Sequence, residues 1–152
     1  MSARRAEPGG PCRVVEEVLR LEEIIAAVSG PGLGAVATFS GVVRDHHDGR
    51  RVLRLEYHAY VPMAERVLRE IAAEVASRHG TAHVAIVHRI GSLQIGATSV
   101  VIAVAAAHRR EALAACAHAI ERVKALAPIW KKEYYEGGAS WIEGTGTEPA
   151  AI

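Results

Sequence analysis

Lysine is rare in this chain and lies only near its C-terminal end. The sequence has 18 Lys and Arg residues, of which three are lysines: Lys124, Lys131 and Lys132. Arginine is thus the usual cation of the chain. A lysine amine can lose its proton near neutral pH when its surroundings lower its pKa, whereas a guanidinium cannot. We therefore treat the three lysines as candidate catalytic or anion-binding residues.

The spacing of apolar residues predicts a helix over 109–127 with Lys124 on its apolar side. At about 100° per residue, Lys124 lies only about 20° around the axis from Leu113. Two interpretations stay open. In the first, the amine reaches solvent near the C-terminal end of the helix, where the dipole favours a cation. In the second, it occupies a partly dry pocket as a nucleophile or proton carrier, with a pKa lowered by the neighbouring lysines.

The start of the same helix carries three basic residues in a row, His108, Arg109 and Arg110. Cations are unfavourable at the positive end of a helix dipole unless an anion binds there. Free backbone N–H groups and two guanidinium groups would make a phosphate site. The alternative is that Glu111 and solvent neutralise the charges. No glycine-rich nucleotide-binding motif accompanies the site.

A polar loop follows the second predicted strand and contains Asp45, His46, His47 and Asp48. These residue types can bind metals, but adjacent residues in a turn point in different directions, and the spacing matches no established metal motif. We therefore expect no metal here. Arg44, at the end of the strand, is better placed to contact an anion.

Periodicity and turn residues predict one α+β domain with a mixed sheet and two main helices. The Asp-Gly turn at 48–49 predicts a hairpin between the second and third strands, and Glu136-Gly137-Gly138 predicts a terminal one. In chain order, the expected elements are a strand over 13–18, a helix over 21–28, strands over 34–43 and 53–60, a helix over 62–79, strands over 83–90 and 98–107, the helix over 109–127, and a hairpin over 129–143.

Length and charge exclude several classes of protein. A chain of 152 residues with a net charge of +1 suits one domain and argues against a nucleic-acid-binding surface. No apolar run is long enough to span a membrane, and no secretory signal is evident, so we expect a cytoplasmic protein. Cys12 falls in an expected flexible leader (residues 1–12), and Cys116 in the core. The domain is expected over 13–143, with a flexible tail over 144–152.

Several segments together resemble the catalytic, large subunit of molybdopterin synthase, and the resemblance covers about residues 13–143. They are TFSGVVRDH at 38–46, LEY at 55–57, HRIG at 88–91, AHR at 107–109, and Lys124 followed by APIWKKE at 127–133. The last segment, when it occurs together with the first, is highly specific to this family. The resemblance implies an α/β hammerhead-type fold with an additional small antiparallel sheet.

The resemblance also implies an activity. Members of the family form a homodimer in which each protomer binds a small ubiquitin-like sulfur carrier with a Gly-Gly C-terminus, giving a heterotetramer. Sulfur passes from the thiocarboxylate of the carrier to cyclic pyranopterin monophosphate, which becomes molybdopterin, the dithiolene ligand of molybdenum cofactor. No bound cofactor, membrane or nucleic acid is implied.

The family's functional positions correspond to residues of this chain. Lys124 and Lys131 match the catalytic lysines, while acid/base and covalent roles for Lys124 both stay open, as does the question of which protomer supplies Arg44. The implied substrate-binding residues are Val42, Val43, Arg44, His108, Arg109, Lys124, Lys131, Lys132 and Glu133. Two alternatives are a non-catalytic carrier-binding module and a metal-dependent hydrolase that uses His46, His47 and His108.

Overall fold

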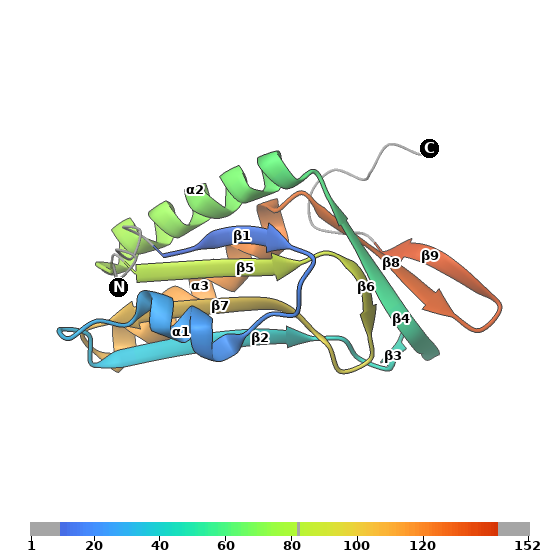
Figure 1. Cartoon of the computed structure of the whole chain (residues 1–152), viewed down its shortest axis with the longest axis horizontal. Coiled ribbons are helices and arrows are strands. Elements are labelled where there is room, and N and C mark those ends of the chain that lie inside the picture. Colours follow the sequence, from blue (N-terminus) through green and yellow to red (C-terminus); the bar gives the residue numbers. More distant parts are fainter. Residues whose placement is uncertain (1–9, 82, 143–152) are drawn as a thin grey trace, which may run out of the picture.

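The protein, described by a computed structural model over residues 10–81 and 83–142, contains two β-sheets and three helices within those ranges. The first sheet has four strands, in the order β1 (Cys12–Val15), β5 (His83–Arg89), β7 (Thr98–Ala106) and β2 (Ala35–Val42). The second contains β3 (His46–His47), β4 (Arg50–Ala59), β8 (Ile129–Tyr135) and β9 (Gly138–Ile142), with β6 (Gly91–Gln94) also paired to β4. Figure 1 shows the second sheet beyond one end of the first.

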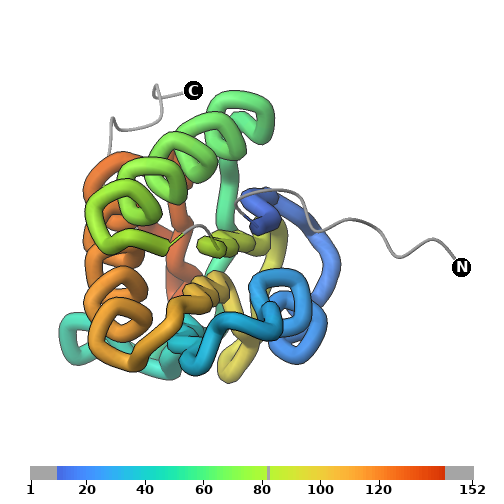
Figure 2. Tube along the Cα trace, turned by 90° about the vertical axis from the view of Figure 1, so that its left-hand side faces the viewer, coloured from blue at the N-terminus to red at the C-terminus, as the bar shows by residue number. Residues whose placement is uncertain are grey.

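The helices cover both faces of the four-stranded sheet. α2 (Val61–His79) and α3 (Arg109–Leu126) pack on one face, and α1 (Leu21–Val28) packs on the other, as Figure 2 shows. α1 matches its predicted range. Pro62 lies in the first turn of α2, and Gly80 ends that helix with a left-handed φ of 66°, a conformation that glycine adopts without a steric penalty.

The two central strands, β5 and β7, have nearly continuous apolar sequences. They pair in antiparallel register, with Ile86 opposite Ile102. Both isoleucines are fully buried on the α2 and α3 side, whereas Ala85 and Ala103 face α1. Alternate residues of each strand thus enter two separate cores, which explains why neither strand alternates between apolar and polar residues.

The predicted hairpin between the second and third strands is wrong. β2 pairs with β7, whereas β4 lies in the other sheet. The Asp-Gly turn instead joins the two-residue strand β3 to β4, with His47 opposite Arg50. Asp48 and Gly49 both have positive φ values, 50° and 76°, as a tight hairpin turn requires. The turn was therefore predicted correctly, but β3, the first of the two strands that it joins, was not predicted.

The alternation of side chains along β4 breaks at one point. Strict alternation would place Leu53 on the same face as the buried Leu55, but Leu53 is 48% exposed, whereas Val52 is buried. A bulge between Val52 and Arg54 in the pairing with β8 accounts for the change, because an extra residue in one strand shifts which side chains face inward.

The buried face of α3 differs from the predicted apolar stripe. Leu113, used above as its reference, is 62% exposed. The face that contacts the sheet carries mostly small side chains: Ala112, Ala115, Cys116, Ala119 and Val123. Alanines allow the helix to approach the sheet closely, so small residues rather than the leucine mark the core side. Lys124 lies at the edge of this face and is exposed.

The remaining fold predictions divide between confirmed and corrected. β8 and β9 form the predicted terminal hairpin, and Cys116 is buried. β1 ends at Val15, short of the predicted 18, and Cys12, expected in the leader, begins this strand and pairs with Ile86. The tail over 144–152 and the first nine residues lie outside the described ranges.

The architecture confirms a single α+β domain with an additional small antiparallel sheet. The structure contains no helix, over the residues it describes, with the length and apolar character that crossing a membrane requires.

Candidate active site

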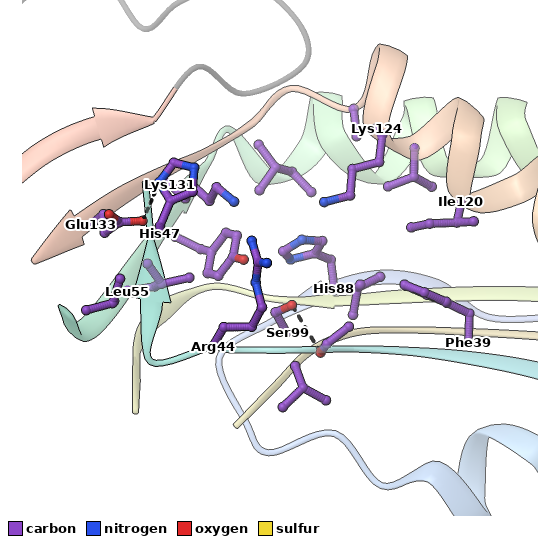
Figure 3. A pocket seen from close by; sticks show the side chains of 18 of the residues that line it. Phe39, Arg44, His47, Leu55, His88, Ser99, Ile120, Lys124, Lys131 and Glu133 are labelled. Atoms are coloured by element: carbon purple, nitrogen blue, oxygen red, sulfur yellow. Dashed lines mark hydrogen bonds and ion pairs between the residues drawn. The ribbon is translucent and has the colours of Figure 1, made fainter. Parts of the chain in front are cut away.

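A pocket of about 230 Å³ lies where the two sheets meet the C-terminal half of α3. Its apolar lining includes Phe39, Leu55 and Ile120, and its polar lining comes from residues far apart in the sequence. Figure 3 shows Lys124 entering from α3, Lys131 and Glu133 from β8, and Arg44 from the segment after β2. The junction of the sheets therefore gathers three of the candidate cations in one place.

The alternation of β8 decides which of its charged residues face the pocket. Lys131 and Glu133 are two residues apart and line the pocket together, as expected for side chains on one face of a strand. Lys132 points to the opposite face, where its ammonium lies 5.4 Å from the Tyr134 ring and 5.7 Å from the Trp141 ring. The structure therefore separates the two adjacent lysines.

The Lys131 amine has a lowered pKa. Burial is the main cause, and the positive charges of Lys124 and Arg44 lower the Lys131 pKa further, while Glu133 opposes them. Like charges in a partly dry pocket disfavour another ammonium. Repulsion between the two lysines, which the sequence analysis anticipated, therefore contributes to the lowered pKa of Lys131.

Glu133 is the acidic residue of the pocket lining and is only 5% exposed. Its Oε2 lies 3.2 Å from Nδ1 of His47, which comes from β3. A buried carboxylate needs such partners, because leaving it unpaired in a dry site costs several kcal/mol. Arg44, Lys124 and Lys131 still outnumber it, so the pocket suits an anionic ligand.

Three polar residues that the sequence analysis did not select also line the pocket: His88, Tyr57 and Ser99. His88 is 7% exposed, and burial lowers its pKa to about 4. The Tyr57 hydroxyl is hydrogen-bonded to the Ser99 side chain, and burial raises the Tyr57 pKa. A histidine within the buried strand 83–89 was the available signal, because an ionisable residue rarely occupies such a strand without a local role.

Of the two candidate valines, only Val42 lines the pocket. Its neighbour Val43 is 3% exposed and packs in a small core with Val52 and Leu55. Backbone hydrogen bonds with Gly96 and Ala97 hold Val43 in place. The rigid Val43 segment thus fixes the point from which Arg44 extends.

His108 and Arg109 lie at the opposite end of α3 from Lys124. Lys124 lies fifteen positions after Arg109 in the helix, about 22 Å along the axis. With Arg110, Glu111 and Leu113, they line a separate groove. Among the described residues, Glu111 makes no ion pair with either arginine, and its Oε2 is buried without a hydrogen-bond partner. The interpretation in which Glu111 neutralises these charges is therefore not supported.

The histidines of the hydrolase alternative do not come together. His46 contacts Asp45 at 2.8 Å, and His47 contacts Glu133, whereas His108 lies at the far end of α3. Over the part of the chain that the structure describes, no three His, Cys, Asp or Glu side chains are arranged to hold a metal ion. The geometry thus argues against the metal-dependent hydrolase.

Comparisons with known proteins agree with the geometry. The family model described as MoaE protein matches residues 14–126. A molybdopterin synthase catalytic subunit of Bacillus subtilis is 46% identical over 129 residues, which cover 85% of this chain and 82% of that protein. One from Nostoc is 49% identical over 126 residues, 82% of this chain and 76% of that protein.

A solved structure of molybdopterin synthase from Staphylococcus aureus superposes with a TM-score of 0.84 at 41% identity, covering 86% of this chain and 96% of that one. Both the fold and the sequence are therefore shared over most of the length. With the lysine-bearing pocket in the same chain, these matches show that the protein belongs to the MoaE family, the catalytic subunits of molybdopterin synthase.

Proposed function

We propose that this chain transfers sulfur from the C-terminal thiocarboxylate of a small ubiquitin-like carrier to cyclic pyranopterin monophosphate, forming the dithiolene of molybdopterin. The observation that carries the proposal is the convergence of Lys124, Lys131 and Arg44 on one pocket with a single buried carboxylate, Glu133. Both reactants are anions, and three cations in a partly dry pocket would bind them and stabilise negative charge as it develops.

The three cations have different roles in this proposal. Arg44 can hold the substrate phosphate with two parallel hydrogen bonds. Lys124, on the exposed rim, meets the incoming thiocarboxylate and serves either as a general acid and base or as a transient acyl acceptor. Lys131, the more buried amine, stabilises the developing negative charge. Val42 and Glu133 line the same pocket as further substrate contacts.

The sulfur must come from outside this chain. The Cys116 thiol is buried, and burial raises its pKa, which makes it a poor nucleophile. Cys12 belongs to β1, on the edge of the four-stranded sheet away from β2. A Gly-Gly carrier tail has no side chains to clash with the walls of a narrow pocket. We expect the reaction to take place in the cytoplasm.

The second set of candidate anion-binding residues, His108 and Arg109, can reach a pocket only in another copy of the chain. The pocket volume of about 230 Å³ is below the roughly 300 Å³ at which small-molecule sites begin. His108 and Arg109 are too distant to complete the pocket within one chain. In a homodimer, these residues of one protomer would reach the pocket of the other, while Arg44 serves its own chain. Two carriers would make the assembly a heterotetramer.

A direct assay tests the activity. The purified chain is mixed with thiocarboxylated carrier and cyclic pyranopterin monophosphate, and molybdopterin is measured. We expect product formation that depends on the thiocarboxylate. Carrier binding with no product from authentic components would favour the non-catalytic binding module instead.

Mixing two variants that are each impaired at subsaturating pterin tests the shared site. If Arg109 acts across the dimer, unfolding and refolding Lys124→Ala together with Arg109→Ala yields hybrid dimers with one intact site, and about a quarter of all sites regain the wild-type kcat/KM. Lys124→Ala refolded with Lys131→Ala is the matched control. Because both lysines line the same pocket, no intact site can form. Recovery no greater than that of the control would refute the shared site.

A further inference from the structure

His88 presents a defined tautomer to the pocket. Its Nδ1 lies 2.8 Å from the backbone oxygen of Arg89. A carbonyl oxygen only accepts hydrogen bonds, so Nδ1 must carry the hydrogen and donate. In the neutral ring, Nε2 then holds a lone pair and can only accept. Since the ring lines the pocket, this lone pair is available to a donor there.

The surroundings of His88 keep the ring neutral. Its pKa is lowered to about 4, mainly by burial; the hydrogen bond to the Arg89 oxygen opposes this shift in part, and the nearby charge of Lys124 adds to it. The charged groups that line the pocket around it are Lys124, Lys131, Arg44 and Glu133. An additional positive charge among three cations would be unfavourable. A neutral acceptor is therefore the form that His88 takes at neutral pH.

Neighbouring side chains hold the ring in one orientation. The Tyr57 ring meets the His88 ring edge to face, with centroids 5.0 Å apart and planes at 66°. Tyr57 is hydrogen-bonded to Ser99, whose hydroxyl donates to the Gly41 oxygen at 3.2 Å. This chain of contacts links four strands, β5, β4, β7 and β2. Because both the ring and its backbone partner are fixed, the direction of the Nε2 lone pair is fixed as well.

We propose that His88 is a positioning residue for Lys124, whose ammonium donates a hydrogen bond to Nε2 of the neutral imidazole. The inference rests on the proposed function and deepens it. Figure 3 shows the Lys124 side chain extending from α3 towards the His88 ring. Arg44 and Lys131 repel this ammonium, and a carboxylate partner would neutralise it. A neutral acceptor holds it over the pocket while leaving its charge available to the thiocarboxylate.

A pair of substitutions separates this role from a structural one. In His88→Gln, the longer amide can place an acceptor oxygen near the position of Nε2. In His88→Asn, the shorter amide retains a donor near Nδ1 for the Arg89 carbonyl but has nothing at Nε2. We expect His88→Asn to lower kcat for molybdopterin formation about 10²-fold, as small misplacements of catalytic groups do, with the pterin KM and carrier affinity unchanged. We expect His88→Gln to recover most of the rate.

The outcomes separate the two hypotheses. An inactive wild-type protein with authentic components would refute the proposed function itself. If the wild type is active, equal rates in His88→Asn and His88→Gln would refute only the positioning role, whether both rates are near that of the wild type or both are reduced.

A spectroscopic measurement keeps the test decisive even if a His88 variant fails to fold. In protein labelled with ¹⁵N-histidine, the Nε2 resonance of His88 should move in Lys124→Met, because the lone pair loses its donor. Lys132→Met is the matched control, since Lys132 lies on the other face of β8, and it should leave the resonance in place. An unmoved resonance in Lys124→Met would refute the hydrogen bond.

Discussion

The two ends of α3 carry cations under opposite physical conditions. At the C-terminal end, Lys124 benefits from the negative end of the helix dipole and faces a pocket. At the N-terminal end, Arg109 and Arg110 are exposed at the positive end, with no ion pair to Glu111 among the described residues. The helix dipole by itself stabilises the cation at the C-terminal end. The arginines at the N-terminal end are in a favourable position only when an anion binds beside them.

This difference assigns different tasks to the two ends. The enclosed end can change the chemistry of its groups, because burial and neighbouring charge lower the pKa of Lys131 and of His88. The exposed end can attract and orient an anion but does little to alter its reactivity. Substitutions at the pocket end should therefore change rates, and those at the exposed end should change affinity.

The largest effect is expected at Lys124. Lys124→Ala should lower the rate of molybdopterin formation about 10³-fold, within the range for loss of an acid–base group. Lys124→Arg retains the charge but no titratable amine, so it should also lose most activity while still binding carrier. Glu121→Ala, an exposed change on the same helix, is the control and should leave the rate near that of the wild type. Full activity in Lys124→Ala would contradict the assignment.

The dryness of the pocket end should appear in the pH dependence of stability. Above pH 6.5, His88 is neutral in both the folded and unfolded states. As the pH falls, the unfolded chain takes up a proton near 6.5, whereas folded His88 takes one up only at about 4. The free energy of unfolding should therefore fall by about 3 kcal/mol between pH 6.5 and 4.

Urea unfolding of the wild type and of His88→Gln at pH 7 and pH 4 measures this contribution. The wild type should lose about 3 kcal/mol more than the variant between the two pH values. Equal losses would mean that the pocket does not exclude water from His88.

Lys131 should show a smaller effect on rate and a distinct pH signature. Lys131→Met should slow molybdopterin formation about 10²-fold, as loss of one group that stabilises developing charge does. Because burial and the Lys124 charge lower the Lys131 pKa below 10.5, the wild-type rate should fall with rising pH earlier than an ordinary lysine would allow. In Lys131→Arg, the residual rate should lack this alkaline fall, because the guanidinium keeps its charge. A pH–rate profile with the same alkaline limb in both proteins would contradict the assignment.

The smallest effect is expected at the exposed end of α3. Arg109→Ala should raise the pterin KM about 10-fold, equivalent to about 1.4 kcal/mol, with kcat nearly unchanged. The effect should shrink as salt is added, because exposed charges are screened. A fall in kcat with no change in KM would place Arg109 in the chemistry and abolish the contrast between the two ends.

Much of the fold could be predicted from local pattern. The range of α1 was predicted residue for residue, and the strands β5 and β7, which are apolar on both faces, were placed correctly. Strand pairing could not be predicted equally well, because β2 could pair with β4 across a turn or with the distant β7, and local sequence does not distinguish them. The Leu113 error has a similar origin, since only the packed structure shows that alanines form the contact face of α3.

The candidate site was partly visible in the sequence. The scarcity of lysine pointed to Lys124 and Lys131, and the Arg44 loop was recognised as an anion contact. His88, Tyr57 and Ser99 were missed as members of the site because each lies on a different strand. Only the junction of the two sheets brings them within reach of one another.

The sequence alone determined the types of most elements and, through the lysine and APIWKKE motif, the family. Those features depend on neighbouring residues and on residue identity, which a linear chain displays. Tertiary structure decided that Lys131 is buried enough for its pKa to fall, which face Lys132 takes, and that His88 is buried beside Lys124. Burial and electrostatic coupling depend on distances between residues far apart in the chain. A net charge of +1 therefore conceals a local cationic pocket.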